Sequence, residues 1–403
     1  MASSDLRAAW NLSRASAAVE AYRWYHSHPE LSGRESATAA RIRSRLDGLG
    51  LETFGCGGHG VVGILRNGDG PVVAYRADTD ALPVRESTGL PYASTVTTRV
   101  GDAEIPVMHA CGHDAHIAVA LALVELLAAE REAWRGTVVW IFQPAEEIAQ
   151  GAAAMVADGL WERAPKPDVL LAQHITALPA GSVRIGFGDV MNLGDSWRVR
   201  IRGRGAHGAR PHEAIDPVLI AAHTIVRLQS VVSRMVDPAH PVILTVGEVH
   251  AGTKENVIPD EATISLNIRT PDADVRADVL ESVRRVLRAE TAASGADEPT
   301  VEVISSFPRC VNDPSAAAAV ADALAGEFGD DAVARDLRAT GSEDVGALAD
   351  AIGVPLVFWM FGAYREGRDT MPSNHTPDFG PDDVQAIDTG VRAGIAALAR
   401  FLA

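Results

Sequence analysis

Cysteine and long apolar runs are both scarce in this chain of 403 residues. The three cysteines, Cys56, Cys111 and Cys310, cannot form a complete set of disulfides, which favours a reducing compartment. No apolar run approaches the ~20 residues that a membrane span requires. Charged residues interrupt the N-terminal segment too early for a secretory signal. We therefore expect a cytoplasmic protein with no membrane partner.

Positive charge and aromatic residues are also in short supply. Thirty-six Lys and Arg face 53 Asp and Glu, a formal net charge of -17, and aromatic residues make up only 5% of the chain. Nucleic-acid binding needs clustered Lys and Arg, so we expect no nucleic-acid partner. The hydrophobic fraction of 47% is typical of a globular enzyme. The length exceeds one ordinary core and predicts two domains.

The first and last parts of the chain alternate between strand-like and helix-like segments. Val72–Tyr75, Thr137–Phe142 and Val169–Ala172 are short apolar runs typical of buried strands, and Ala115–Ala129 is helical in pattern. The same alternation of strands and helices resumes after about residue 305, with a helix expected at Ser315–Phe328. This alternation predicts an α/β fold with a mixed, mostly parallel sheet flanked by helices.

The stretch between these parts has a different pattern. Trp197–Arg202 alternates with period two, as a half-exposed strand does, and Pro217–Val236 fits a long helix. The full order of strand, helix, strand, strand, helix, strand is that of a split βαβ sandwich. We therefore expect a domain made of residues 1–190 and 305–403, and an inserted ferredoxin-like α+β domain made of residues 191–304.

The densest chemical signal is the segment Met108–His116, with the sequence MHACGHDAH. Cys111 and His113 lie two residues apart just before a predicted helix, so one loop can direct both at one ion. Thiolate and imidazole are good ligands for a borderline-soft divalent metal. A buried cysteine beside surface histidines is the alternative, and these two residues alone do not decide between them.

Polar residues also follow several predicted strands. Glu146 and Glu147 come shortly after an apolar strand, where they either form a solvated helix end or divide the work of metal ligand and proton acceptor. Asp78 and Asp80 follow another strand and either ligate metal or orient a metal-bound histidine. The carboxyl ends of parallel strands are where α/β sheets place ligand sites.

Two histidines complete the set of strand-end and loop candidates. His174 follows the strand Val169–Ala172, and His375 lies in a late loop. Either alone is more often structural than a metal ligand. Together with the other clusters they predict one site.

Seven motifs in this order and spacing resemble the amidohydrolase branch of the dizinc aminoacylase and carboxypeptidase family. They are RADTDALP, MHACGHDAH, QPAEE, AHGARPH, NVIP, GSED and NHTP. The branch includes hydrolases of indole-acetyl-amino acids, hippurate hydrolases and bacterial N-acyl-amino-acid aminoacylases. The resemblance covers nearly the whole chain and implies the interrupted two-domain fold expected above.

The resemblance implies specific roles for matching residues. Two divalent metal ions per subunit are implied, zinc by default, with manganese, cobalt or nickel able to take the same ligands. Glu146 takes the place of the catalytic base. Asp80 takes the place of the aspartate that contacts a metal ligand without binding the metal itself. The implied metal ligands are Cys111, His113, Glu147, His174 and His375. Relatives outside this branch have a ligand histidine where Asp78 stands, so the role of Asp78 stays open.

The inserted domain carries further candidates by the same resemblance. His207 matches a histidine that crosses a dimer interface and stabilises the tetrahedral intermediate in the neighbouring site, which implies a homodimer formed through this domain. Asn256 and Arg269 match substrate-contacting positions, and an arginine fork suits a substrate carboxylate. Glu343 and Asp344 of the GSED motif either line the substrate side or cap the helix that follows.

These observations predict a metal-dependent enzyme that hydrolyses the amide bond of small N-acyl amino acids, releasing a carboxylic acid and a free amino acid. A dipeptidase or carboxypeptidase of the same family is the first alternative, because it would use the same metals and base. A non-catalytic metal-binding scaffold is the second, and it would tolerate loss of Glu146.

Overall fold

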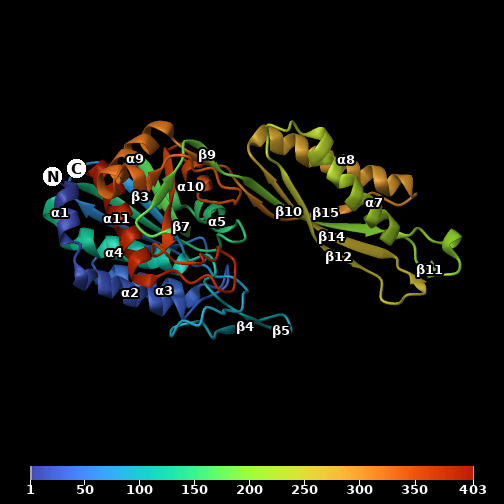
Figure 1. Ribbon diagram of the computed structural model, residues 1–403, viewed down its shortest axis with the longest axis horizontal. Helices are drawn as coiled ribbons and strands as arrows, with labels where there is room; N and C mark the ends of the chain where they lie inside the picture. Colours follow the sequence, from blue (N-terminus) through green and yellow to red (C-terminus); the bar gives the residue numbers. More distant parts are fainter. Residues whose placement is uncertain (1, 403) are drawn as a thin grey trace. The chain divides into compact units, whose positions relative to one another are not determined.

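The computed structural model describes residues 2–402, which form two compact units (Figure 1). The first unit contains the chain up to Val190, Cys310–Arg338, and the chain from Asp344 onward. The second, here called the inserted unit, contains Met191–Arg309 and also the short segment Ala339–Glu343. The inserted unit thus runs a few residues past the expected border at 304 and gains a segment from the late part of the chain.

An eight-stranded mixed sheet forms the centre of the first unit, in the order β1-β2-β6-β3-β7-β18-β8-β17. Its middle strands are parallel, as predicted, and β6 is buried along its whole length because layers of helices cover the sheet. The strands are β1 (Glu52–Cys56), β2 (Gly60–Asn67), β3 (Val72–Asp78), β6 (Gly136–Gln143), β7 (Val169–Pro179), β8 (Val183–Ile185), β17 (Val333–Ala334) and β18 (Leu356–Tyr364).

Helix α4 (His113–Ala129) is apolar on nearly every side because it packs against β3 and against two other helices, α2 and α11. The remaining helices of this unit are α1 (Ala2–Ala9), α2 (Leu12–His26), α3 (Ser36–Gly48), α5 (Gly151–Ala157), α6 (Leu160–Arg163), α9 (Pro314–Phe328), α10 (Gly346–Asp350) and α11 (Asp383–Leu402). Two small ribbons accompany them, β4 (Thr97–Val100) with β5 (Ala103–Pro106) and β9 (Gly188–Met191) with β16 (Cys310–Asn312).

The inserted unit is the expected ferredoxin-like sandwich, with a four-stranded antiparallel sheet in the order β12-β14-β10-β15. Helices α7 and α8 pack against the sheet around a separate apolar core. Its elements are β10 (Leu193–Arg202), β11 (Ala206–His207), α7 (Pro217–Ser230), β12 (Ile243–Ala251), β13 (Val257–Ile258), β14 (Glu261–Thr270), α8 (Ala273–Ala293) and β15 (Thr300–Phe307).

A side-chain cap and a change of helix type set two of the helix boundaries. Helix α2 begins at Leu12 because the Asn11 side chain accepts hydrogen bonds from the N–H groups of Ser13 and Arg14. The helix expected over residues 217–236 is α-helical only to Ser230 and continues as one π-helical turn, Val231–Met235. Within residues 2–402, no helix is both long and apolar enough to cross a membrane.

Candidate metal centre

Neighbouring parallel strands bring the candidate residues of the first unit to one edge of the sheet. Asp78 ends β3 and pairs in register with Gln143, which ends β6. His174 lies in β7, on the other side of β3. Because β3, β6 and β7 run in the same direction, the polar residues that end β3 and β6 and the nearby His174 meet at the carboxyl edge of the sheet.

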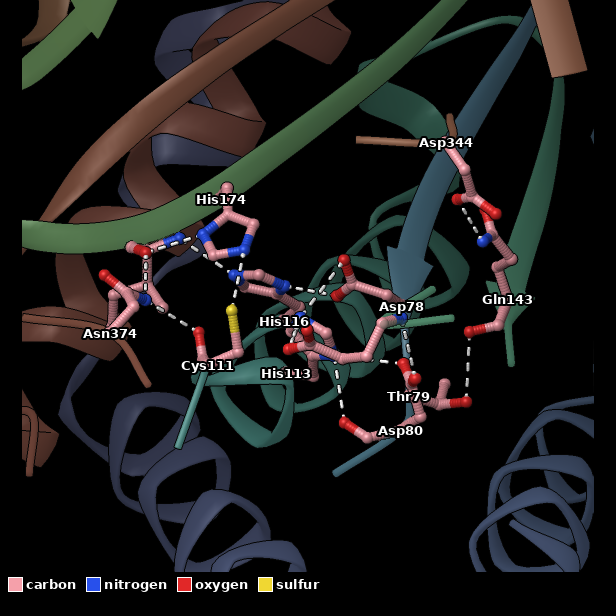
Figure 2. Close-up of polar contacts among 12 residues, drawn as sticks. Asp78, Thr79, Asp80, Cys111, His113, His116, Gln143, His174, Asp344 and Asn374 are labelled. Carbon is pink, nitrogen blue, oxygen red and sulfur yellow. Dashed lines mark hydrogen bonds and ion pairs between the residues drawn. The ribbon is translucent and has the colours of Figure 1, made fainter. Parts of the chain in front are cut away.

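The turn before α4 presents the thiol and the imidazole of the Cys-Gly-His motif. Gly112 adopts a φ of 83°, and a Cβ at this position would lie 2.4 Å from Cγ2 of Ile175. Only glycine fits this left-handed, closely packed turn. The side chains of Cys111 and His113 therefore emerge on the same side, towards His174 (Figure 2).

Donor atoms of five side chains form a continuous cluster here. Sγ of Cys111 lies 3.5 Å from Nε2 of His174 and 3.2 Å from Nε2 of His375. The same nitrogen of His375 lies 3.3 Å from Oε1 of Glu147, which in turn lies 3.9 Å from Nε2 of His113. Atoms that share a tetrahedral zinc ion at about 2.0–2.3 Å are separated by about 3.3–3.8 Å. The spacing of the cluster fits metal ligation.

Two buried polar atoms in this cluster have no hydrogen-bond partner among the described residues: Nε2 of His113 and Oε1 of Glu147. Buried polar atoms are normally satisfied, and an ion is one reason for an exception. Burial raises the pKa of Cys111 well above its usual value, and the charges of Glu147 and Glu146 raise it further. A divalent cation removes this conflict because it holds a thiolate between carboxylates. The donor set therefore fits a metal.

His113 is oriented by Asp80, one of the predicted site residues. Nδ1 of His113 lies 2.9 Å from the Asp80 carbonyl oxygen and 3.2 Å from Oδ1. The other nitrogen, Nε2, lies 3.6 Å from Oδ2 of Asp78 and 3.9 Å from Oε1 of Glu147. Burial alone would lower the pKa of His113, but Asp78 and Asp80 outweigh it and raise the pKa to about 10. A cation at Nε2 would replace that proton. Asp80 also accepts a hydrogen bond from the N–H of Glu147 at 3.0 Å.

Asp78, whose role the sequence left open, is engaged on both carboxylate oxygens. Oδ1 contacts Nδ1 of His116, and Oδ2 accepts a 2.6 Å hydrogen bond from Arg76. His116 uses its other nitrogen to accept the N–H of Ile175 at 2.8 Å. Both ring nitrogens of His116 are therefore occupied within the protein, whereas Oδ2 of Asp78 also lies 3.6 Å from Nε2 of His113.

Asp344 closes this network of hydrogen bonds. Its carboxylate accepts a hydrogen bond from Nε2 of Gln143 at 2.6 Å (Figure 2). It also accepts one from the N–H of Ala152 at 3.1 Å. It therefore binds the first turn of α5. Glu146 is buried, with a carboxylate oxygen within 4.8 Å of one of Asp344.

The three candidates of the inserted unit fall into two groups. His207 is exposed on β11, opposite Val257 of β13, and both line an open groove of about 660 Å³. The carbonyl of Asn256 accepts the N–H of Gly208, so Asn256 lies beside His207. Arg269 lies near the C-terminal end of β14, whereas β13 and Asn256 precede its N-terminal end. It is paired with Gly194 and donates a hydrogen bond to Ser342. The structure thus brings His207 and Asn256 together and leaves Arg269 apart.

The motif analysis gave no role to Asn374, which holds two loops of the site together. Its side-chain amide donates to the carbonyls of Cys111 at 2.9 Å and Ile175 at 3.1 Å. The next residue, His375, has a φ of 70°, which non-glycine residues rarely adopt. The only signal in the sequence was the position of Asn374 next to His375, because its partners are backbone atoms.

Comparison with known proteins identifies the family of this chain. The model of the peptidase family M20/M25/M40 matches residues 74–400. The chain belongs to this family. An N-acyl-L-amino acid amidohydrolase of Geobacillus stearothermophilus is 37% identical over 68% of this chain and 72% of the relative. Thermostable carboxypeptidase 1 of Saccharolobus solfataricus is 32% identical over 91% of this chain and 90% of the relative.

A solved structure extends the similarity to both units. The YXEP protein of Bacillus subtilis, described as a dinuclear metal-binding peptidase of the M20 family, has a TM-score of 0.76 and 29% identity, with 97% of this chain and 99% of that chain covered. This M20/M25/M40 family member is therefore a metal-dependent amidohydrolase.

Proposed function

We propose that this enzyme hydrolyses the amide bond of N-acyl amino acids, with two divalent ions held by five side chains. The observation that supports this proposal is the cluster of donor atoms, which includes the carboxylate of Glu147, next to the buried carboxylate of Glu146. The similarity to an N-acyl-L-amino acid amidohydrolase supports this substrate class. The proposed ligands are Cys111, His113, Glu147, His174 and His375.

Metal ions bound at this site would polarise the amide carbonyl and lower the pKa of a water molecule towards ~7. Glu146 then accepts the proton of the attacking water and returns it to the leaving nitrogen. Glu147 has its N–H held by Asp80, and Asp80 also holds His113, so one carboxylate orients two of the proposed ligands.

The distribution of candidates in the inserted unit supports a homodimer. Glu261, at the end of β14 next to the His207 ribbon, and Arg269 are eight residues apart, which corresponds to about 27 Å along a strand. One small substrate cannot bridge that length, so His207 and Asn256 would serve the site of the partner subunit. Arg269 would bind the substrate carboxylate, and His207 would donate to the developing oxyanion.

Zinc is the proposed metal, because borderline-soft thiolate and imidazole ligands suit it, and manganese, cobalt or nickel could occupy the same donors. The cytoplasm is the proposed location, because all three cysteines are free and buried.

The deciding experiment measures amine release from a panel of N-acyl amino acids that vary in acyl length and amino acid. Metal-loaded and chelated enzyme are compared, and dipeptides of equal size are assayed in parallel. We expect hydrolysis of acyl amino acids that chelation abolishes and a divalent ion restores. Cleavage of dipeptides alone would favour a peptidase, the alternative supported by similarity to a carboxypeptidase. If the enzyme hydrolyses neither class of compound, the result would favour a non-catalytic metal-binding scaffold.

A further inference from the structure

Glu35 occupies the position before α3 where a side chain normally caps the helix, but it does not do so. Glu30 takes over that task, accepting the N–H groups of Ala37 at 3.2 Å and Thr38 at 2.8 Å. The Glu35 side chain is therefore directed elsewhere, and its role must be sought outside its own helix.

One oxygen of Glu35 holds two backbone groups. Oε1 accepts hydrogen bonds from the N–H groups of Gly33 and Ala145, both at 2.8 Å. Glu35 is fully buried, and Oε2 has no hydrogen-bond partner among the described residues. Burial, with the charge of Asp80 adding, raises the pKa of Glu35 to about 7. A buried carboxyl of this kind weakens folding, so packing alone does not explain it.

The contact to Ala145 links Glu35 to the proposed base. Ala145 has a φ of 52°, a backbone conformation that residues with a side chain rarely adopt, and it directly precedes Glu146. On the other side of Glu146, the N–H of Glu147 is held by Asp80. Carboxylates therefore fix the backbone immediately before and immediately after Glu146.

We propose that Glu35 is a positioning residue for the hydrolysis, which holds the left-handed backbone of Ala145 and thereby directs the Glu146 carboxylate at the attacking water. This inference rests on the role of Glu146 in the proposed function. Glu35 is not one of the proposed metal ligands, and it acts through the backbone N–H of Ala145. What matters is one acceptor oxygen at Oε1, since Oε2 receives no hydrogen bond from the described residues.

Three variants separate positioning from a purely structural role. Glu35→Gln keeps an amide oxygen that can accept from Ala145, whereas Glu35→Met has similar length and no acceptor. Glu30→Met is the matched control, because it removes a nearby carboxylate that also holds two backbone N–H groups but does not touch the Glu146 loop. For each variant we would measure kcat, KM, metal content and Tm.

We expect Glu35→Met to lower kcat by about 10- to 100-fold, as displacement of a catalytic group by up to ~1 Å can do. KM and metal content should stay near wild type, and Glu35→Gln should recover most of kcat. Glu30→Met should lower Tm and leave kcat unchanged. An unchanged kcat in Glu35→Met, or an equal loss in Glu35→Gln or Glu30→Met, would overturn the proposal.

Amide hydrogen exchange gives a second readout that needs no substrate. In Glu35→Met, exchange should accelerate in peptides covering residues 143–151, and in Glu30→Met it should accelerate in α3 instead. Unchanged protection of residues 143–151 in Glu35→Met would refute the positioning role even if activity fell. If the wild type hydrolyses no amide at all, the proposed function fails, and the exchange pattern still shows whether Glu35 holds the backbone of residues 143–151.

Discussion

Arg76 donates a 2.6 Å hydrogen bond from Nη1 to Oδ2 of Asp78, and neither side chain is accessible to solvent. A second nitrogen, Nη2, lies 3.3 Å from Asp344, and Nε donates to Gln143 at 2.9 Å. One guanidinium thus joins the ends of β3 and β6 to the late segment that begins at Asp344. Removal of one partner from such a buried ion pair leaves an uncompensated charge.

Replacement of Arg76 should therefore strongly destabilise the folded protein. We expect Arg76→Met to lower the free energy of unfolding by about 3–5 kcal/mol, because Asp78 and Asp344 lose their counter-ion. Urea denaturation measures the change. Arg66→Met is the control, since its pair with Glu52 is more than half exposed on both sides and should contribute less than about 1 kcal/mol. Equal effects of the two substitutions would contradict the importance of the buried pair.

Loss of the proposed base should separate turnover from metal binding. Glu146→Gln should lower kcat by about 10²–10⁴-fold, because the amide cannot accept the proton of water. Metal content, measured by plasma mass spectrometry, should stay near wild type. Glu147→Gln is the comparison, since it alters a proposed ligand and should lower metal content as well. Wild-type turnover by Glu146→Gln would rule out its assignment as the base.

Loss of the Cys111 thiol should weaken the binding of metal. We expect Cys111→Ser to weaken binding of at least one divalent ion by roughly tenfold or more, because a hydroxyl is a poor substitute for a soft thiolate. Competition with a chromogenic chelator measures the affinity. Cys56→Ser serves as control, because Cys56 is also buried but donates to the carbonyl of Met155. The assignment would fail if both variants kept wild-type affinity.

Stability should fall as the pH rises, through His26. Burial alone would lower the pKa of His26, but hydrogen bonds to Asp114 and Glu86 outweigh it and raise the pKa from 6.5 to about 10. A raised pKa means that the protonated pair stabilises the fold fully below about pH 6.5 and that this contribution disappears as the pH approaches about 10.

Comparison with a variant that cannot titrate isolates this effect. The difference in unfolding free energy between wild type and His26→Gln should be largest near pH 6. Between about pH 6.5 and about pH 10 it should shrink by about 1.4 kcal/mol for each pH unit. Urea denaturation across the range measures it. A difference that does not change with pH would show that His26 is not held protonated.

Subunit mixing tests whether His207 acts on the partner. Glu146→Gln and His207→Ala should each be nearly inactive alone. Co-expressed in equal amounts, they should recover about a quarter of the wild-type activity, because half of the dimers are mixed and each has one intact site. No recovery, with mixed dimers present, would mean that His207 acts within its own chain, and an active His207→Ala enzyme would mean that His207 has no part in the reaction.

The sequence by itself determined the α/β pattern, the ferredoxin-like insertion and the motifs of the candidate site. Strand-end positions follow from local apolar runs, and a Cys-x-His turn before a helix restricts where its donors can point. These features depend on neighbours in the chain, so the pattern of residues is sufficient to predict them. The resemblance to a known family then connected motifs that lie far apart, such as those of Cys111 and His375.

Only the tertiary structure decided which distant residues support the site. Glu35 reaches Ala145 across 110 positions of sequence, and Asp344 reaches Gln143 across 201. Glu35 holds a backbone N–H group, which every residue except proline possesses, so no residue pattern marks the contact. Asp344 could equally have capped the helix that follows it. Which hydrogen bonds such carboxylates form depends on how the chain packs, because burial forces each one to take the donor that lies nearest in space.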